Sequence, residues 1–348
     1  MTPPLPPVAV KRLEGADAAR WDAFVADFPA ATFFHRAGWK TVIEETLGHP
    51  CHFLYAEVDG ALKGLLPLVH VKSRLFGNSL VSTGFTVGGG PVATDDRVLA
   101  ALDREALALA DRLDVDVLEY RSGTAQHPDW AHKSDLYASF RKRLDADPDK
   151  ALKQAPRHQR QSVRRGERMG VTGVIDADVD RFYELYAESV RNLGTPVFAR
   201  KYFRRLHEVF QPDCNIVTAE REGRALASTL CFYFRDQALP YFGGSTPDSR
   251  ACSAGDVMVW EIMRRAIERG CLTYDFGRSK VGTGPYSYKE NWGFEPAPLT
   301  YEYKLRRGDA PPDVNPLNPK YRLFIAAWKR LPLGVSKLVG PMIVRNLA

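Results

Sequence analysis

The same succession of segments occurs twice along this chain. Residues 52–69 read as a strand, a tight turn at Asp59-Gly60 and a second strand, and residues 215–232 repeat this pattern around Glu222-Gly223. A glycine-rich segment, a helix and a short strand follow in both copies: residues 88–90, 97–113 and 115–122 in the first, and 243–245, 255–269 and 272–279 in the second. The repetition predicts two copies of one α/β unit; the alternative is that two common hairpins arose independently.

The length of 348 residues agrees with two domains, each large enough to bury its own core. The segment 145–149, rich in aspartate and containing a proline, falls between the copies and predicts the joint. We therefore expect a first domain over residues 1–150 and a second over residues 151–310. A basic amphipathic tail is expected over residues 311–348.

Several classes of protein are disfavoured by composition. The five cysteines form no C-x-x-C pair, which indicates reduced core residues and no metal site. No apolar run approaches the roughly 20 residues that span a bilayer, and the proline-rich N-terminus does not resemble a secretory signal. We expect a cytoplasmic protein, either free in the cytoplasm or peripheral on the inner membrane. The net charge of +6 favours anionic partners such as phosphates, nucleic acid or an acidic membrane surface.

A basic helix is predicted directly after the joint. With Pro156 at its first position, Arg157, Arg160, Arg164 and Arg168 fall on one face. Like charges stacked in this way repel one another, and phosphate groups would relieve the repulsion. Arg160 and Arg164 are therefore candidates for binding the phosphates of a donor. The alternative is a solvated basic face.

A second candidate phosphate-binding region precedes the helix expected over residues 255–269. Small residues there would let backbone N–H groups approach an anion near a helix N-terminus. The candidates are Gly243, Gly244, Ser245, Ser253 and Gly255. Ser253 or Asp256 could equally be a simple helix cap.

Residues 274–294 hold most of the candidate catalytic residues. In this segment charged residues lie among glycines and aromatic residues at the end of a strand. An amine that attacks a carbonyl needs a base for its proton and a positive group for the oxyanion or the donor phosphate. We expect Asp275 to be the base and Lys289 or Arg278 to be the positive group. Tyr286 joins the candidate catalytic set and Lys280 the phosphate-binding set. A structural salt-bridge network is the alternative.

Together these stretches resemble the FemAB-like (Fem-type) branch of the GNAT acyltransferase superfamily, including the set associated with PEP-CTERM and exosortase systems. The resemblance covers most of the chain. It is carried by Phe34–Trp39, Pro156–Gly170, Gly194–Phe198, Asp275–Ser279, Lys289–Phe294 and Asn315–Tyr321. It implies two tandem GNAT-like domains with mixed, mostly antiparallel sheets flanked by helices. It also implies that Lys289, in its Lys-x-x-Trp-Gly setting, lies near the donor.

The family resemblance implies transfer of an acyl or aminoacyl group to an amine. Donors in the wider family are acyl-CoA or aminoacyl-tRNA. The stretch from Arg250 to Gly255 lacks the usual pyrophosphate-binding pattern, so acyl carrier protein and charged tRNA are alternative donors. No bound cofactor and no DNA partner are expected. Because no Lys-x-x-Trp-Gly follows Arg121-Ser122, we expect the first domain to be non-catalytic and to shape the acceptor cleft.

The acceptor is less well defined by the sequence. The tail combines Trp328 and several leucines with lysine and arginine, a mixture that suits a membrane interface, although it could also pack on the domains. His35, Trp39 and Trp292 are candidates for acceptor binding. We predict an N-acyltransferase that uses a thioester donor and a membrane-associated amine, such as a sphingoid base or a lipid-linked amino sugar. The alternatives are a tRNA-dependent aminoacyltransferase of the peptidoglycan type and a non-catalytic scaffold of an exopolysaccharide pathway.

Overall fold

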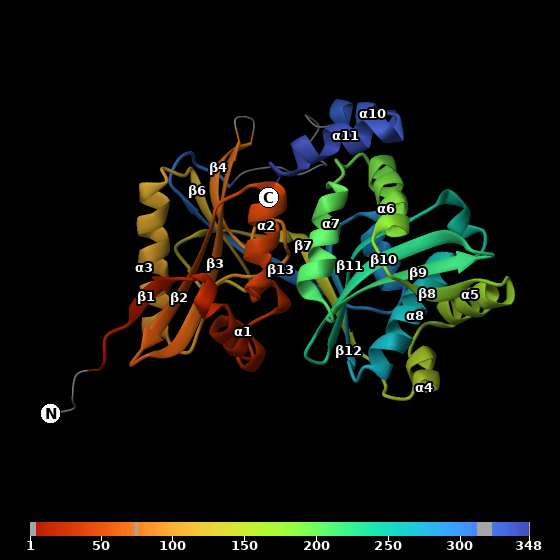
Figure 1. Ribbon diagram of the computed structural model, residues 1–348, viewed down its shortest axis with the longest axis horizontal. Coiled ribbons are helices and arrows are strands. Elements are labelled where there is room, and N and C mark those ends of the chain that lie inside the picture. The colour runs from red at the N-terminus through yellow and green to blue at the C-terminus, as the bar shows by residue number, and fades with distance from the viewer. Residues whose placement is uncertain (1–4, 74–75, 312–321, 348) are drawn as a thin grey trace. The chain divides into compact units, whose positions relative to one another are not determined.

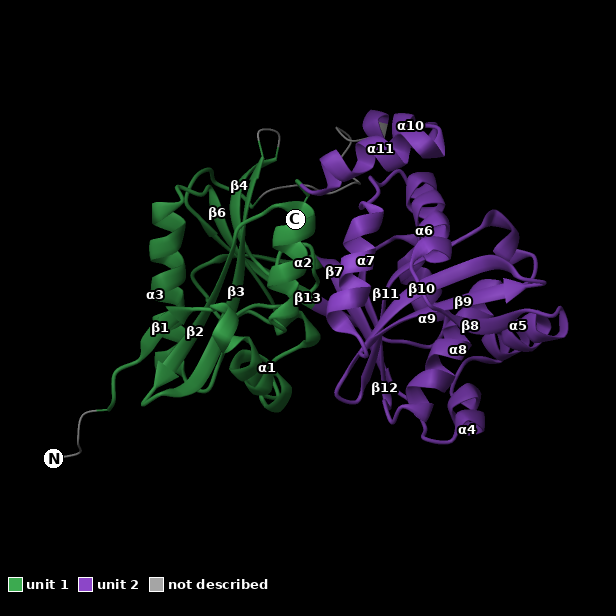
Figure 2. Ribbon diagram, viewed as in Figure 1, with its two compact units in different colours: residues 1–135, 299–313, 346–348 green, residues 136–298, 314–345 purple. Residues whose placement is uncertain are grey.

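The computed structural model describes residues 5–73, 76–311 and 322–347 (Figure 1). The chain divides into two compact units. Unit 1 comprises residues 1–135, 299–313 and 346–348, and unit 2 comprises residues 136–298 and 314–345 (Figure 2). Asn315–Tyr321 and the first part of the expected tail lie outside the described residues.

Unit 1 is built on one sheet with the strand order β1-β2-β3-β4-β6-β13. Its strands are β1 (Ala9–Arg12), β2 (Cys51–Val58), β3 (Ala61–Ser73), β4 (Gly77–Ser82), β6 (Val117–Gly123) and β13 (Pro296–Leu305), and the short β5 (Val92–Ala93) pairs with β3. Its helices are α1 (Ala18–Asp27), α2 (Gly38–Leu47) and α3 (Asp96–Arg112). In Figure 1, α3 lies on one face of this sheet and α1 and α2 on the other.

Unit 2 repeats this plan with the strand order β8-β9-β10-β11-β12-β7. Its strands are β8 (Thr172–Asp176), β9 (Cys214–Arg221), β10 (Arg224–Phe234), β11 (Gln237–Ser245), β12 (Thr273–Lys280) and β7 (Ala131–Arg143). Its helices are α4 (Pro148–Lys153), α5 (Arg157–Arg168), α6 (Asp180–Leu193), α7 (Arg200–Phe210), α8 (Ala254–Glu268), α9 (Gly284–Asn291), α10 (Arg322–Lys329) and α11 (Leu333–Val344).

The predicted repeat is visible in the pairing of the strands. In each unit four strands pair in antiparallel order, the fifth pairs in parallel with the fourth, and the sixth is antiparallel to the fifth. The two hairpin turns also match. Asp59 and Gly60 have φ values of 49° and 75°, and Glu222 and Gly223 have 54° and 76°, as a type I′ turn requires. The prediction of an α/β fold with mixed, mostly antiparallel sheets flanked by helices is confirmed.

The sixth strand of each sheet comes from an unexpected part of the chain. β7 follows β6 in sequence but pairs with β12 in unit 2, and β13 follows β12 in sequence but pairs with β6 in unit 1. Residues 136–150 of the predicted first domain therefore belong to unit 2, and residues 299–310 of the predicted second domain belong to unit 1. A strand can pair with any partner of the right register, however distant in sequence. A division of the chain into contiguous domains therefore cannot predict where β7 and β13 pair.

Buried side chains fill separate cores in the two units. In unit 1, α3 packs Val98, Leu102 and Leu109 against the sheet, at the spacing of one helix face. In unit 2, α8 packs Val259, Ile262 and Met263 in the same way. No helix in the described part of the chain is long and apolar enough to cross a membrane.

Candidate active site

Lys289 is the chemically most distinctive residue of unit 2. It lies on α9 and is only 8% exposed. Its Nζ atom donates to the carbonyl oxygens of Gly277, at 2.9 Å, and Arg278, at 3.1 Å. Burial lowers the pKa of Lys289 to about 7, although the negative charge of Asp275 opposes this change. Near neutral pH the amine therefore exists in both protonation states.

The two carbonyl groups are presented by a bulge in β12. The register between β12 and β7 shifts between Asp275 and Arg278, and Gly277 inside the shift has a φ of +69°. The carboxylate of Asp275 fixes this bulge. Its Oδ1 accepts from the N–H of Gly277 at 2.8 Å, and its Oδ2 accepts from Nε of Arg141 at 2.7 Å.

The environment of Asp275 bears on its predicted role as a base. The residue is 4% exposed, and both carboxylate oxygens already accept a hydrogen bond. Both oxygens thus hold neighbouring groups of the chain, the N–H of Gly277 in the bulge and the guanidinium of Arg141. The geometry thus fits a positioning role for Asp275 better than proton transfer.

The other predicted catalytic residues surround the same bulge. The guanidinium of Arg278 lies 4.3 Å from the centre of the Tyr137 ring. Tyr286 packs edge-on against Phe140, with 5.0 Å between ring centres, and Nζ of Lys289 lies 5.3 Å from that same Phe140 ring. Lys280, which was predicted to bind phosphate, ends β12 opposite Tyr137.

A carboxyl group that the sequence did not mark as catalytic lies nearby on α8. Oδ1 of Asp256 accepts from the hydroxyl of Tyr288, the residue before Lys289, at 3.0 Å. Burial raises the pKa of Asp256, and the hydrogen bond from Tyr288 offsets part of this rise. The two residues are 32 positions apart in sequence, so no local pattern could have paired them.

The predicted phosphate-binding glycines lie in or beside regular structure. Gly243, Gly244 and Ser245 end β11 and pair with Thr229, Ser228 and Ala227 of β10. A Cβ at Gly244 would lie 2.4 Å from the carbonyl oxygen of Leu185, so close packing on α6 explains this glycine without a ligand.

The start of α8 holds the other two predicted residues. Ser253 is the N-cap of α8, has a φ of +56° and makes no side-chain capping bond, and Gly255 follows it within the first turn. The neighbouring helix α5 packs tightly on this point, because a Cβ at Gly166 would lie 2.9 Å from the carbonyl oxygen of Cys252.

β11 and β12 pair over only a short stretch. The parallel pairing joins Gln237 to Thr273 and Ala238 to Tyr274, and both strands then continue, to Ser245 and Lys280, outside it. The bulge that binds Lys289 lies in this continuing part of β12. The edge of β11 next to the bulge is therefore a place in unit 2 where an extended ligand could add to the sheet.

The corresponding strands of unit 1 are bridged by the chain itself. β4 pairs with β6 over residues 79–81 and 117–119, and the N–H of Arg121 then donates to Oγ of Ser82 at 2.8 Å. The N–H groups of Gly89 and Gly90 both donate to the carbonyl of Arg121, each at 3.2 Å. The glycine-rich segment thus lies directly against the end of β6.

The candidate acceptor-binding residues are buried core residues. In unit 1, Nε2 of His35 lies 2.8 Å from the carbonyl of Gly90, and Nε1 of Trp39 donates to the carbonyl of Phe33 at 3.2 Å. Trp292 packs in the core of unit 2 and ends α9. Gly293 follows it with a φ of +74°. The Lys-x-x-Trp-Gly motif therefore has a structural role, because it caps α9 and anchors it.

The basic helix α5 begins at Arg157, and Pro156 is its N-cap instead of its first residue. Arg160 donates to the carbonyls of Lys153 and Ala155, both at 2.9 Å, and so satisfies groups at the end of α4. Arg164 is exposed. Of the two predicted phosphate-binding arginines, Arg160 therefore already has a structural role.

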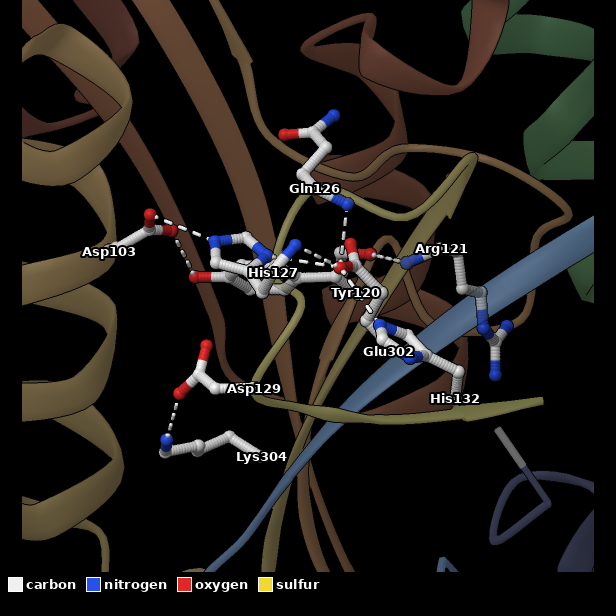
Figure 3. Close-up of polar contacts among 10 residues, drawn as sticks. Asp103, Tyr120, Arg121, Gln126, His127, Asp129, His132, Glu302 and Lys304 are labelled. Atoms are coloured by element: carbon white, nitrogen blue, oxygen red, sulfur yellow. Dashed lines mark hydrogen bonds and ion pairs between the residues drawn. The ribbon is translucent and has the colours of Figure 1, made fainter. Parts of the chain in front are cut away.

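A second polar cluster lies inside unit 1 (Figure 3). Oε1 of the fully buried Glu302, on β13, accepts from the N–H groups of Gln126 and His127 at 2.7 and 2.6 Å. The His127 ring lies between this carboxylate and that of Asp103, with Nδ1 3.2 Å from Glu302 and Nε2 3.0 Å from Asp103. Among the described residues, no group of three or more His, Cys, Asp or Glu side chains has a geometry that could hold a metal ion.

Residues 153–290 match the family model described as an acetyltransferase (GNAT) domain. No curated protein sequence is significantly similar to the chain. The match to the family model includes the segment from β8 to β12 and extends into α9, so it contains the bulge and Lys289.

Several solved structures share the fold over most of the chain. FemX has a TM-score of 0.67 and 16% identity, covering 91% of this chain and 100% of its own. A tandem GNAT protein from the clavulanic acid biosynthesis pathway has a TM-score of 0.56 and 15% identity, covering 87% and 100%. The C-terminal domain of a putative lysylphosphatidylglycerol synthetase from Agrobacterium fabrum has a TM-score of 0.54 and 13% identity, covering 84% and 92%.

Proposed function

Because the protein is an acyltransferase of the GNAT superfamily with a Fem-type tandem fold, we propose that it transfers an acyl group from a thioester donor to the amine of a membrane-associated acceptor. The observation that carries the proposal is the buried Lys289, with a pKa of about 7, beside the short pairing of β11 and β12.

The donor is proposed to lie along the edge of β11 beyond Ala238. The pantetheine arm of coenzyme A or of acyl carrier protein is extended and contains amides, so it can hydrogen-bond to a strand edge as an added strand would. The comparison with unit 1 supports this choice, because there Ser82 and Gly90 contact the end of β6 instead. Unit 2 is therefore the proposed catalytic half.

The chemistry is proposed to be direct attack of a neutral amine on the thioester carbonyl. The new C–N bond forms, the C–S bond breaks, the amine loses a proton and the thiol leaves with one. A neutral Lys289 would donate its two N–H groups to Gly277 and Arg278 and keep its lone pair, so it can accept the proton of the attacking amine. Arg278 would supply positive charge for the oxyanion.

The acceptor is proposed to be an amine presented at a membrane, such as a sphingoid base or a lipid-linked amino sugar. One observation supports a lipid: α10 and α11 expose apolar side chains together with lysine and arginine. Unit 1 is proposed to shape the acceptor-binding side and not to catalyse, because no Lys-x-x-Trp-Gly motif follows Arg121-Ser122 in the sequence.

A charged tRNA is the second candidate donor. The exposed Arg157, Arg164, Arg165 and Arg168 on α5 form a basic face suited to a polyanion, which is more charge than a single pyrophosphate needs. In that case the protein would be an aminoacyltransferase that acts on a peptidoglycan-type acceptor.

The test is an in vitro reaction with each donor class. Purified protein is incubated with sphinganine and acyl-CoA, acyl carrier protein thioester or aminoacyl-tRNA, and products are identified by mass spectrometry. We expect an N-acylated product and free thiol from a thioester donor, unaffected by RNase and absent with the Lys289→Met variant. Transfer only from charged tRNA, abolished by RNase, would replace this proposal with the aminoacyltransferase one.

A deletion strain tests the acceptor and the scaffold alternative in cells. Total lipid and envelope extracts are compared with those of the parent strain. Loss of an N-acylated lipid with accumulation of its free amine would support a lipid acceptor, whereas a changed glycan or peptide would point to another amine. Full rescue by Lys289→Met would favour a non-catalytic scaffold.

A further inference from the structure

The exposed apolar side chains of the protein are concentrated at its C-terminal helices. Six of the ten large apolar side chains exposed in the described part of the chain lie on α10, on α11 or at the adjoining end of α6. They are Leu193, Leu323, Phe324, Val335, Leu338 and Met342. A concentration of exposed apolar side chains on neighbouring elements usually marks an interaction site.

Helix α11 has one buried and one apolar exposed face. Ser336, Gly340 and Val344 are buried at the spacing of one face, and a Cβ at Gly340 would lie 2.7 Å from the backbone nitrogen of Val197. On the other side, Leu338 is 72% exposed and Met342 is 66% exposed. A helix that packs on a domain ordinarily turns polar residues outward, so this outward face is not explained by folding.

The charged residues of α10 and α11 themselves are all basic. Residues 322–347 contain no aspartate or glutamate. Lys329, Arg330 and Arg345 are exposed, and the remaining lysine, Lys337, pairs with Glu184 of α6. The surface is therefore apolar and basic together.

We propose that the outward face of α11, with the first turn of α10, docks on an anionic lipid bilayer. Apolar side chains would enter the interface between headgroups and acyl chains, and lysine and arginine would contact lipid phosphates. A second copy of the chain is a poorer occupant, because a symmetric contact would bring identical basic residues together. The inference rests on the proposed function in one respect, since it explains how a lipid-borne amine reaches the enzyme.

The direct test is sedimentation with vesicles made of equal parts phosphatidylglycerol and phosphatidylcholine, or of phosphatidylcholine alone. We expect the wild-type protein to bind the anionic vesicles and the Leu338→Glu/Met342→Glu variant to bind them at least about tenfold more weakly. The matched control is Met169→Glu, an exposed methionine at the end of α5, which should bind as wild type does. Lys329→Ala/Arg330→Ala should weaken binding by about fivefold per charge.

Three outcomes would overturn the proposal. They are failure of the wild-type protein to bind anionic vesicles, unchanged binding by Leu338→Glu/Met342→Glu, and a wild-type dimer in solution that this variant dissociates. The acyl-transfer proposal is tested separately with a water-soluble short-chain amine, on which this variant should act as wild type does. Vesicle binding without any acyl transfer would leave the docking surface standing and remove the proposed reaction.

Discussion

The Nζ atom of Lys289 lies 2.9 Å from the carbonyl oxygen of Gly277, and this bond joins α9 to the bulge of β12. The bond places a largely buried amine beside the part of β12 that no longer pairs with β11. A lysine used only for surface charge would keep its Nζ in water, so this placement requires another explanation.

Replacing Lys289 should abolish catalysis without unfolding unit 2. Lys289→Met keeps the volume of the side chain but removes the proton acceptor, and we expect turnover to fall by about 100-fold or more. Glu290→Gln, the next residue and exposed, is the matched control and should retain activity. In the wild type, turnover should rise with pH through about 7, the pKa of Lys289. Activity retained by Lys289→Met would remove the proposed role.

The same pKa predicts how stability depends on pH. The folded protein releases the Lys289 proton at about pH 7, whereas the unfolded chain keeps it to about 10.5, so the unfolded state binds more protons between these values. The free energy of unfolding of wild type relative to Lys289→Met should therefore rise with pH in that window, by up to about 1.4 kcal/mol per pH unit. Urea unfolding at several pH values measures it; a flat difference would mean that Lys289 is not desolvated.

Asp275 should matter for positioning more than for proton transfer. Asp275→Asn keeps one acceptor but loses the ion pair with Arg141, so the bulge should loosen, the protein should lose about 1–3 kcal/mol and turnover should fall. Lys289 would remain the base but would lose a negative charge that raises its pKa, so turnover should still rise with pH, at a pH below 7. An acidic limb that disappears in Asp275→Asn would instead identify Asp275 as the base.

The two predicted phosphate-binding arginines should behave differently. Arg160→Gln loses hydrogen bonds to Lys153 and Ala155 and should lower stability by about 1 kcal/mol. Arg164→Gln, on the exposed face of α5, should leave the unfolding midpoint unchanged and raise KM for a polyanionic donor. Thermal unfolding and donor titration of both variants separate the effects. Equal stability loss in the two would contradict the structural role of Arg160.

The cluster around His127 should stabilise unit 1 most at mildly acidic pH (Figure 3). Burial alone lowers the pKa of His127, but its hydrogen bonds to Asp103 and Glu302 outweigh this and raise the pKa to about 9. The folded state thus binds the extra proton, and the contribution, present in full below pH 6.5, is lost as pH rises through 9. Between pH 6.5 and pH 9 we expect the free energy of unfolding to fall by about 1–2 kcal/mol, a value that allows for solvent screening.

Glu302 determines how the stability of unit 1 falls at acidic pH. Burial alone would raise its pKa, but the hydrogen bonds from His127 and Gln126 hold the pKa below the usual value. Its contribution is present above pH 4.5 and is lost as pH falls. Asp103→Asn should move the alkaline loss of stability to lower pH, and Asp129→Asn, an exposed neighbour, should not. Identical pH profiles for wild type and Asp103→Asn would contradict the charged state assigned to His127.

Local sequence patterns predicted the helices and strands but not which unit's sheet β7 and β13 join. The Asp59-Gly60 and Glu222-Gly223 turns, the helices near residues 97–113 and 255–269, and the two closing strands all form within a few residues of the predicted bounds. They depend on turn chemistry and on hydrophobic periodicity, which are local properties. The pairing of β7 with β12 and of β13 with β6 depends on contacts between segments distant in sequence. Neither β7 nor β13 carries a local signal for its partner.

The sequence alone determined that a charged motif from Asp275 to Lys289 begins within the closing strand of a repeated α/β unit. Only the tertiary structure decided what each of its residues does. It engages both oxygens of Asp275, buries Lys289 against two carbonyls, pairs Asp256 with Tyr288 and places His35, Trp39 and Trp292 in cores. The physical reason is that a residue's type fixes its possible chemistry, whereas protonation and access depend on burial and on partners distant in sequence.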